Sequence, residues 1–277
     1  MRTMTGMTTV TPFDTYERRL WEGRAEAYSR SFARLCAYPA PVMLDAARVV
    51  TGSRVLDVGT GPGTAAALAV ERGATVTAVD ADPSMVELAR GNIPGAQVVR
   101  AALPDLPFAA GCFDAVVANF VVNHVGDPAA AVSELYRVVR PGGRVAVSVW
   151  PRLQAPLQSL WQEVMDAAGL VRPAAVPSVA PDKNFDRTVD GLADLLRRAG
   201  LVQVTSDAHA WRHRADIDEW WLGPANGLGA LGVAMSGHDP ETIARVRRQY
   251  DALAARYLVG SGQLELPVAA LIASGNA

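Results

Sequence analysis

The stretch VLDVGTGPGT, residues 55 to 64, is an apolar run that ends in an aspartate and breaks at once into a glycine-rich turn. A buried strand that ends in glycines and feeds a helix places free backbone N–H groups and the positive end of the helix dipole beside a ligand. The absence of side chains lets the ligand approach the backbone closely. This turn is therefore the predicted ligand site, and its spacing and neighbours decide which ligand it takes.

The spacing of the glycines argues against a nicotinamide dinucleotide. That ligand favours G-x-G-x-x-G, in which the third glycine lets helix and strand pack closely. Here the pattern is G-x-G-x-G, and Thr64 stands where the third glycine of the dinucleotide pattern would be. Asp57, two residues before the first glycine, would repel a pyrophosphate. It suits a ligand with an ammonium group, or a role in fixing the turn, and both fit S-adenosylmethionine better than NAD.

A second carboxylate follows the next apolar run. Asp80 ends TVTAVD, residues 75 to 80, in the position from which a carboxylate accepts hydrogen bonds from a ribose diol. This feature is common to NAD and S-adenosylmethionine sites. Asp82 is explained as the N-cap of a helix that begins at Pro83, so it receives no ligand role.

Short valine-rich runs alternate with helical segments through the middle of the chain. Runs this apolar are buried on both faces, and their alternation with helices predicts an α/β fold with a doubly wound, mostly parallel sheet. The predicted strands are residues 54–59, 75–80, 96–101, 113–121 and 144–150.

The two ends of the chain are predicted to add helices to this core. The helical segments are 14–36, 40–50, 156–169, 188–200 and 240–259, with a late strand at 201–211 and an antiparallel last strand at 264–274. We therefore expect one structural domain with three parts. These are an N-terminal helical cap (1–50), a cofactor-binding core (51–150), and the rest of the sheet with a helical substrate-binding lid inserted in the C-terminal half (151–277).

The bulk composition excludes several classes of protein. The 277 residues are 50% hydrophobic, enough for a substantial core, and the formal net charge of −2 gives no attraction toward nucleic acid or an anionic membrane. The amino terminus lacks the apolar core of a signal peptide, and no stretch reaches the roughly 18 apolar residues of a membrane span. We expect a cytoplasmic protein that binds neither nucleic acid nor membrane. The two cysteines and four histidines show no metal-ligand spacing, so no metal is expected.

Four ordered motifs resemble the class I S-adenosylmethionine-dependent methyltransferases, in particular the small-molecule branch of ubiquinone- and menaquinone-biosynthesis-like and natural-product enzymes. They are VLDVGTGPG, TAVDADPSMVELAR, LPDLPFAAGCFDAVVANFVVNHVGDP and LYRVVRPGGRVAVSVW, and they cover residues 54–150. The resemblance implies a seven-stranded Rossmann-like sheet, S-adenosyl-L-methionine as cofactor and a small-molecule methyl acceptor. It leaves a homodimer open.

The resemblance also implies the residues of the cofactor site. These are Gly59, Thr60 and Gly61 at the methionine portion, Asp80 at the ribose, Ala81 and Met85 at the adenine, Asn119 beneath the sulfonium, and Trp21 and Tyr28 closing over the cofactor. The family commonly has an acidic residue after the third strand that binds the adenine amino group, and Ala102 takes that position here. Backbone groups of Ala102 and Leu103, or the side chain of Asp105, remain as candidates for this contact.

Methyl transfer from a sulfonium is an in-line displacement whose leaving group, a neutral thioether, needs no protonation. Alignment and exclusion of water supply on the order of 7 to 11 kcal/mol, and a base adds roughly 10² to 10⁴ in rate for a phenol, amine or thiol. His124 follows the fourth strand at the carboxyl edge of the sheet, where ligands of open α/β folds bind, and is the candidate base. The alternative is a structural histidine bonded to the loop before Asp127.

Four aromatic residues late in the chain are the candidate acceptor-binding residues, because such side chains stack on planar or cationic molecules. They are Trp211, His213, Trp220 and Trp221, and the alternative is that they form the core of the lid. The expected function is methylation of a small aromatic or heterocyclic molecule in bacterial secondary metabolism, a setting favoured by the Ala-, Val-, Arg- and Gly-rich composition. The alternatives are a nicotinamide-dependent oxidoreductase and a methyltransferase-like module that binds cofactor without turnover.

Overall fold

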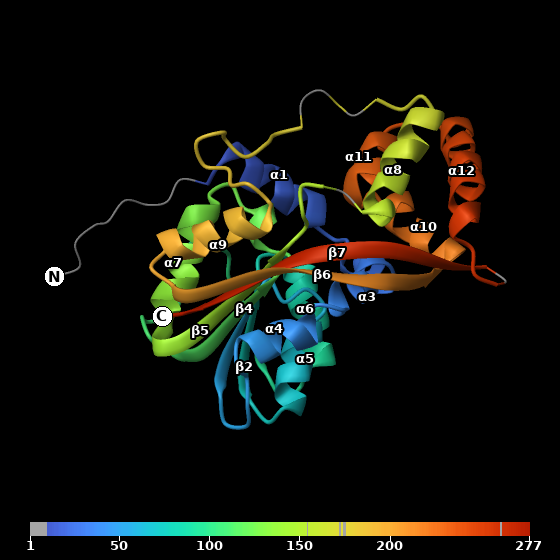
Figure 1. Ribbon diagram of the computed structural model, residues 1–277. Helices are drawn as coiled ribbons and strands as arrows, with labels where there is room; N and C mark the ends of the chain where they lie inside the picture. The colour runs from blue at the N-terminus through green and yellow to red at the C-terminus, as the bar shows by residue number, and fades with distance from the viewer. Residues whose placement is uncertain (1–9, 154, 172, 174–175, 261) are drawn as a thin grey trace.

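The computed structural model describes residues 10–153, 155–171, 173, 176–260 and 262–277, and among these residues seven strands form one sheet (Figure 1). Its order is β3-β2-β1-β4-β5-β7-β6. The strands are β1 (Arg54–Val58), β2 (Thr75–Asp80), β3 (Gln97–Arg100), β4 (Phe113–Asn119), β5 (Val139–Val149), β6 (Val202–Asp216) and β7 (Gln263–Asn276). Strands β1 to β5 pair in parallel, whereas β7 runs antiparallel to both β5 and β6. The predicted doubly wound, mostly parallel sheet with an antiparallel last strand is confirmed.

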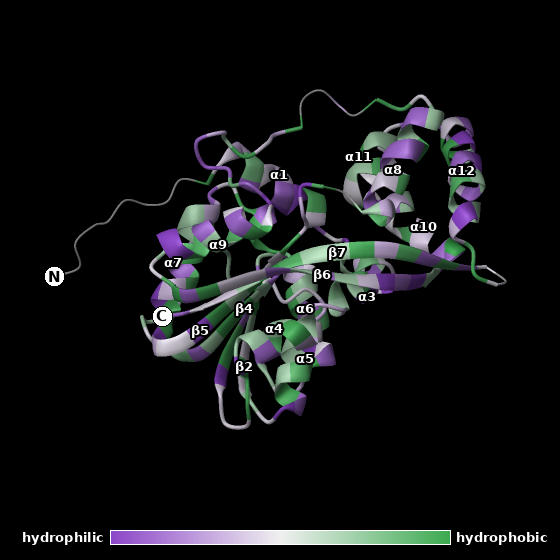
Figure 2. Ribbon diagram, in the orientation of Figure 1, coloured by the Kyte–Doolittle hydropathy of each residue, from purple (hydrophilic) through white to green (hydrophobic). Residues whose placement is uncertain are grey.

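Helices cover both faces of this sheet. On one face pack α4 (Ala40–Ala46), α5 (Thr64–Glu71) and α6 (Pro83–Asn92), and on the other α7 (Pro128–Val138) and α9 (Val189–Arg198). Neighbouring residues of β1 show why the strands are so apolar: Val55 belongs to the first layer, Leu56 to the second, and both are fully buried. Figure 2 shows apolar strands in the middle of the molecule and hydrophilic residues on the outer helices α7 and α12.

Three helices begin at an Asp-Pro pair, and the pair Asp82-Pro83 stands at the predicted helix start. Each aspartate side chain accepts a hydrogen bond from a backbone N–H two or three residues further on, and the proline is the first residue of α6, α7 or α12 (Pro240–Ala254). These caps satisfy N–H groups that have no partner inside the helix. Local capping chemistry thus fixes where these helices begin.

Two boundaries of the predicted elements are wrong for local reasons. The expected helix over 14–36 is three helices, α1 (Pro12–Trp21), α2 (Ala25–Arg30) and α3 (Phe32–Ala37). Gly23 breaks the first junction with a left-handed φ of 70°, and Ser31 breaks the second with a φ of −120° and a ψ of −90°. The fifth strand, predicted over 144–150, already begins at Val139 and includes Pro141-Gly142-Gly143, and its pairing with β4 shifts register after Phe113.

Strands β6 and β7 are longer than predicted and run past the rest of the sheet as a two-stranded ribbon (Figure 1). The segment Leu271–Asn276 of β7 pairs with β5, while the whole strand pairs with β6. On this ribbon pack four helices, called the lid below: α8 (Pro156–Ala167), α10 (Ile217–Ala225), α11 (Gly229–Met235) and α12. No helix in the described parts of the chain is long and apolar enough to cross a membrane.

Candidate functional site

A cavity of about 710 Å³ lies at the carboxyl ends of β1, β2, β3 and β4, between the sheet and the lid. Ligands of open α/β sheets bind at this edge, where the loops leave the strands. Its walls come from the glycine turn, the ends of the strands, the N-terminal helices α1 to α3, and helices α8, α10 and α11. Segments from both ends of the chain therefore enclose one site.

The glycine turn after β1 needs its glycines for the fold as well as for the site. Gly59 has a φ of 66°, and a Cβ there would lie 2.3 Å from Cγ2 of Val121. A Cβ at Gly63, with a φ of 94°, would lie 2.2 Å from Cδ1 of Ile93. Gly61 borders the cavity, as Gly59 does, but a Cβ there would come only within 3.6 Å of a Tyr28 ring carbon. The turn therefore presents bare backbone to the cavity.

Asp57 supports this turn from below. The residue is 1% exposed, and its Oδ2 accepts a hydrogen bond of 2.7 Å from the Thr60 hydroxyl. Burial raises the pKa of Asp57 to about 7. Neither Asp57 nor Thr60 is among the described residues that line the cavity. Of the two roles left open for Asp57, the structure shows the fixing of the turn through the Thr60 hydroxyl, while Thr60 was predicted to contact a ligand through its backbone.

Asp80 lines the cavity at the end of β2. Its Oδ2 accepts a hydrogen bond of 2.8 Å from the Gly61 N–H, and its Oδ1 accepts one of 3.0 Å from the Asp82 N–H. These bonds fix the carboxylate, yet each oxygen keeps a further lone pair for a ligand hydroxyl. Burial raises the pKa of Asp80. Asp80 is thus a positioned acceptor beside the bare backbone of Gly61.

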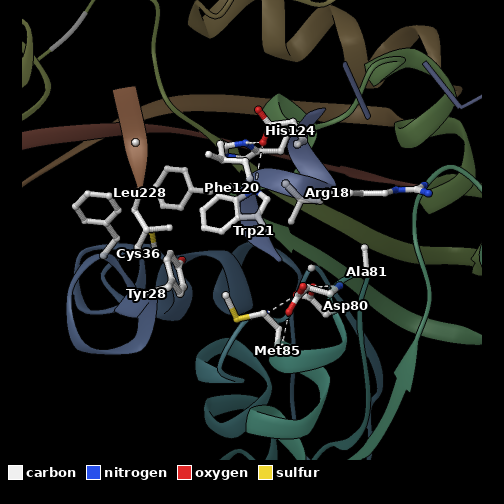
Figure 3. Close-up of a pocket in the computed structure, with 18 of the residues that line it drawn as sticks. Arg18, Trp21, Tyr28, Cys36, Asp80, Ala81, Met85, Phe120, His124 and Leu228 are labelled. Atoms are coloured by element: carbon white, nitrogen blue, oxygen red, sulfur yellow. Dashed lines mark hydrogen bonds and ion pairs between the residues drawn. The ribbon is translucent and has the colours of Figure 1, made fainter. Parts of the chain in front are cut away.

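The next part of the wall is apolar. Figure 3 shows Ala81 and Met85 grouped with Asp80, and Ala102 and Leu103 also line this region. The carbonyl of Ala102 accepts a hydrogen bond from the Asp105 N–H, and Asp105 is not among the described lining residues. Of the candidates for contact with an adenine ring, the groups at residues 102 and 103 line the cavity, whereas the Asp105 side chain would have to move to reach it.

Arg100 also lines this end of the cavity, and sequence reasoning missed it. Its Nε donates a hydrogen bond of 3.2 Å to the Ala81 carbonyl. Arg100 is the last residue of β3, and its position at the carboxyl edge of the sheet could have predicted that it lines the cavity.

Asn119 and Tyr28 connect the strand ends to the N-terminal helices. The Asn119 amide donates to the carbonyl of Cys36 at 2.7 Å and accepts from the Ser148 hydroxyl at 2.7 Å. Burial raises the pKa of Tyr28 well above its usual value, as does, to a smaller extent, the adjacent Cys36. Burial likewise raises the pKa of the Cys36 thiol to about 12. All three residues line the cavity, and the phenol and the thiol are neutral at physiological pH.

His124 is held by a residue that sequence reasoning missed. It ends the short 3-10 helix η1 (Val122–His124), and its Nδ1 lies 2.8 Å from Oε2 of Glu17 on α1. Trp21 Nε1–H donates to the same oxygen at 3.1 Å, and the Trp21 and His124 rings meet edge to face at 5.5 Å (Figure 3). Because the carboxylate accepts the Nδ1 proton, Nε2 is left as the basic nitrogen. The alternative, a bond to the loop before Asp127, is wrong.

Helix α1 is fastened over the cavity at more than this point. Asp14 Oδ2 accepts hydrogen bonds from the backbone and hydroxyl of Thr11, which cap the helix, while its Oδ1 accepts one of 2.7 Å from the Gly126 N–H. Gly126 admits this approach because it lacks a side chain: a Cβ there would lie 1.9 Å from the Thr11 hydroxyl. The loop after β4 is thus bonded to α1 at two points, through His124 to Glu17 and through Gly126 to Asp14.

Of the four aromatic residues predicted to bind the acceptor, Trp220 alone is among the described lining residues. Trp211 and His213 lie on β6 against the ring of Tyr38, at 5.7 and 6.0 Å. Burial lowers the pKa of His213 to about 4. Trp221 packs on Tyr250 at 5.2 Å. The prediction is wrong for Trp211, His213 and Trp221, because the strand and helix turn these faces into the lid core.

Other aromatic residues line a second part of the cavity wall. Phe120 stacks on Trp150 with ring centroids 3.9 Å apart, and Trp161 stacks on Trp220 at 5.7 Å. Phe120 follows β4 with a φ of 56°, a backbone conformation that costs energy in a non-glycine residue and is concentrated at functional sites. Trp150 directly follows β5, so its position at the carboxyl edge of the sheet could have predicted that it lines the cavity. The described residues contain no group of three or more His, Cys, Asp or Glu side chains arranged to hold a metal ion.

Comparison with known proteins gives concordant matches. Residues 56–147 match a family model described as a methyltransferase domain. A malonyl-[acyl-carrier protein] O-methyltransferase of Salmonella typhimurium is 36% identical over 84% of this chain and 86% of its own length. A demethylmenaquinone methyltransferase of Renibacterium salmoninarum is 35% identical over 65% of this chain and 68% of its own. A solved SAM-dependent methyltransferase of Thermotoga maritima has the same fold, with a TM-score of 0.54 at 17% identity over 93% of this chain and 98% of that one.

Proposed function

The chain belongs to the small-molecule class I S-adenosylmethionine-dependent methyltransferases, and on this premise we propose that it methylates a small aromatic or heterocyclic acceptor held beneath the lid. The bound cofactor supplies an activated methyl group on a sulfonium. The residues present fit it, since bare glycine backbone, a fixed carboxylate with free lone pairs and an apolar pocket follow one another along a single wall.

Each part of that wall is assigned to one part of the cofactor. The backbone of Gly59 and Gly61 holds the methionine portion, and Asp80 accepts hydrogen bonds from the ribose hydroxyls. Alanine, methionine and leucine side chains with neighbouring backbone enclose the adenine; they are Ala81, Met85, Ala102 and Leu103. Asn119, Trp21 and Tyr28 cover the reacting centre.

The observation that supports an aromatic acceptor is the aromatic part of the cavity wall. The rings of Phe120, Trp150, Trp161 and Trp220 line the same cavity as the glycine turn. Stacked aromatic pairs contribute about 0.5 to 1.5 kcal/mol beyond the area that they bury. A planar acceptor between these rings is held rigidly, and alignment is the main requirement of an in-line displacement.

His124 and Glu17 supply the base. Glu17 holds the Nδ1 proton, so Nε2 takes the proton of an acceptor hydroxyl or amine as the new bond to carbon forms. Trp21, bonded to the same carboxylate, keeps the imidazole in its orientation. Helix α1 excludes water from this step.

Methyl-transfer assays with radiolabelled S-adenosylmethionine test the proposal. The acceptor panel contains planar phenols, hydroxylated N-heterocycles, a demethylated quinol and malonyl-[acyl-carrier protein], the last two chosen from the relatives. We expect transfer to phenols or heterocycles. Transfer to malonyl-[acyl-carrier protein] alone would contradict the acceptor class, and transfer to the quinol alone would contradict the secondary-metabolite setting that the composition favours.

A further inference from the structure

A buried hydroxyl on the interior strand β5 is bonded to the point where the chain leaves β4. Ser148 is fully buried, as are its neighbours Val147 and Val149. A hydroxyl in such an apolar setting is unfavourable unless hydrogen bonds replace its bonds to water. Within the described chain, the bonds of this side chain go to two consecutive residues, Asn119 and Phe120, and both line the cavity. The hydroxyl therefore serves this part of the cavity wall.

The first of these bonds fixes the orientation of the Asn119 amide. The Ser148 hydroxyl donates to Oδ1 of Asn119 at 2.7 Å, and Nδ2 of Asn119 donates to the Cys36 carbonyl at 2.7 Å. The reversed amide is excluded, because Oδ1 has no proton to donate to the carbonyl of Cys36. The second N–H of Asn119 and the second lone pair of Oδ1 have no partner among the described residues. They remain for a ligand, since Asn119 is only partly buried and lines the cavity.

The second bond holds a strained backbone. The Phe120 N–H donates to the Ser148 hydroxyl at 2.9 Å and to the Ser148 carbonyl at 3.1 Å. The φ of Phe120 is 56°, a conformation that persists in a residue with a side chain only where the surroundings hold it. The Phe120 ring stacks at 3.9 Å on Trp150, two residues after Ser148. Ser148 thus holds the backbone of Phe120, and Trp150 holds its ring.

We propose that Ser148 is a positioning residue of the methyl-transfer site that touches no ligand itself. It is not among the described lining residues, yet through Asn119 it fixes the wall assigned to the reacting centre, and through Phe120 the aromatic wall assigned to the acceptor. An in-line displacement needs both substrates in one alignment, and an error of about 1 Å costs on the order of 10²-fold in rate. This inference rests on the proposed function, because it concerns the alignment of substrates in the same site.

Calorimetry with S-adenosylhomocysteine tests the role toward the cofactor and needs no acceptor. In Ser148→Ala the Asn119 amide loses its hydroxyl partner, and the affinity is expected to fall about fivefold, which corresponds to about 1 kcal/mol. Ser274→Ala makes the same change at a similarly buried serine of β7, bonded to Arg144 and Thr205 outside the described lining of the cavity. This control should keep the wild-type affinity. An unchanged affinity in Ser148→Ala, or an equal loss in both variants, overturns the inference.

A double variant separates positioning from a general loosening of the sheet. In Asn119→Ala the side chain through which Ser148 acts on the cofactor is absent. Adding Ser148→Ala to Asn119→Ala should therefore leave the affinity for S-adenosylhomocysteine unchanged. A further fivefold loss in the double variant would mean that Ser148 acts through the fold alone, and the assignment would be refuted. Urea unfolding of each variant shows that the binding measurements are made on folded protein.

The methyl-transfer assay tests the role in alignment. Ser148→Ala should lower kcat about tenfold and change the KM for the acceptor by less than about threefold, because the hydroxyl aligns the substrates without binding them. A change confined to the acceptor KM would contradict this role.

Failure of this inference and failure of the proposed function give different results. If no aromatic acceptor is methylated but the calorimetric comparison gives the expected pattern, the acceptor class is wrong and the positioning role stands. If aromatic acceptors are methylated and Ser148→Ala behaves as Ser274→Ala does, the function stands and the positioning role is wrong.

Discussion

Replacing Asp80 with alanine should weaken cofactor binding in a way that depends on the ribose. Both carboxylate oxygens are already held by backbone N–H groups, at 2.8 Å from Gly61 and 3.0 Å from Asp82, so the carboxylate is oriented before the ligand arrives. A hydrogen bond to a charged group is worth about 1.5 to 3 kcal/mol, and no new charge pair replaces it in Asp80→Ala. One such bond to the ribose predicts a loss of roughly 10- to 150-fold in affinity for S-adenosylhomocysteine.

The difficulty with this variant is that Asp80 also supports the glycine turn. The assay therefore titrates two ligands by calorimetry, S-adenosylhomocysteine and its 2′-deoxy analogue. In the wild-type protein the deoxy analogue should bind more weakly, because it lacks one of the two hydroxyls. In Asp80→Ala the two ligands should bind with nearly equal affinity, because the group that told them apart is gone.

The comparison of two ligands on two proteins isolates the contact between Asp80 and the hydroxyl. Asp45→Ala, an exposed aspartate paired with Arg72 on the surface, is the control and should leave both affinities unchanged. If Asp80→Ala weakens both ligands by the same factor, Asp80 acts only through the turn and the ribose has been misplaced.

Three further predictions concern stability and catalysis. Burial raises the pKa of Asp57 from an ordinary value of 3.8 to about 7. Between these values the folded state keeps a proton that the unfolded state releases. The free energy of unfolding should therefore fall by up to about 4 kcal/mol as the pH rises from about 4 to 7. In Asp57→Asn this dependence should be reduced in urea titrations, and an unchanged slope would refute the assignment. Glu17→Gln should lower kcat roughly tenfold, through His124, and leave the KM for S-adenosylmethionine unchanged, since it replaces a charge-assisted hydrogen bond by a neutral one; a change confined to KM would speak against this role. Gly59→Ala should lower the free energy of unfolding by about 2 to 5 kcal/mol, because of backbone strain and of the collision with Val121 Cγ2, 2.3 Å from the new Cβ. Gly23→Ala should lower it by about 1 to 2 kcal/mol, since the φ is similar but nothing lies within 4 Å. Equal midpoints of urea unfolding for the two variants would contradict the collision.

Local signals account for the parts of the fold that the sequence predicted well. The second strand is found at the predicted residues 75–80, and the helix capped by Asp82 begins at Pro83 as predicted. Both signals lie within a few residues of the feature that they predict. The break at Gly23 was also local, but a helical run of apolar positions on both sides outweighed it.

The candidate site was harder to predict where it depends on contacts distant in sequence. Glu17 and His124 are 107 residues apart, and no local sequence pattern around either residue predicts that they form a hydrogen bond. Trp211 and His213 are two residues apart on β6 and therefore lie on the same face of the strand, yet this face meets the lid core instead of the cavity. That choice depends on how the lid packs on the ribbon, which no local pattern contains.

Strand β7 belongs to two structures at once, and this has a consequence for the order of events during synthesis. Its segment Leu271–Asn276 completes the sheet beside β5, while the segment Gln263–Ala270 forms the floor on which the lid packs. In the described chain β6 has β7 as its only partner. While residues 263–276 are still inside the ribosome, the nascent chain can form the glycine turn and the first five strands. It then has neither a partner for β6 nor a surface on which the lid can pack. The cofactor half of the enzyme can therefore take shape during translation, and the acceptor half only after β7 has emerged.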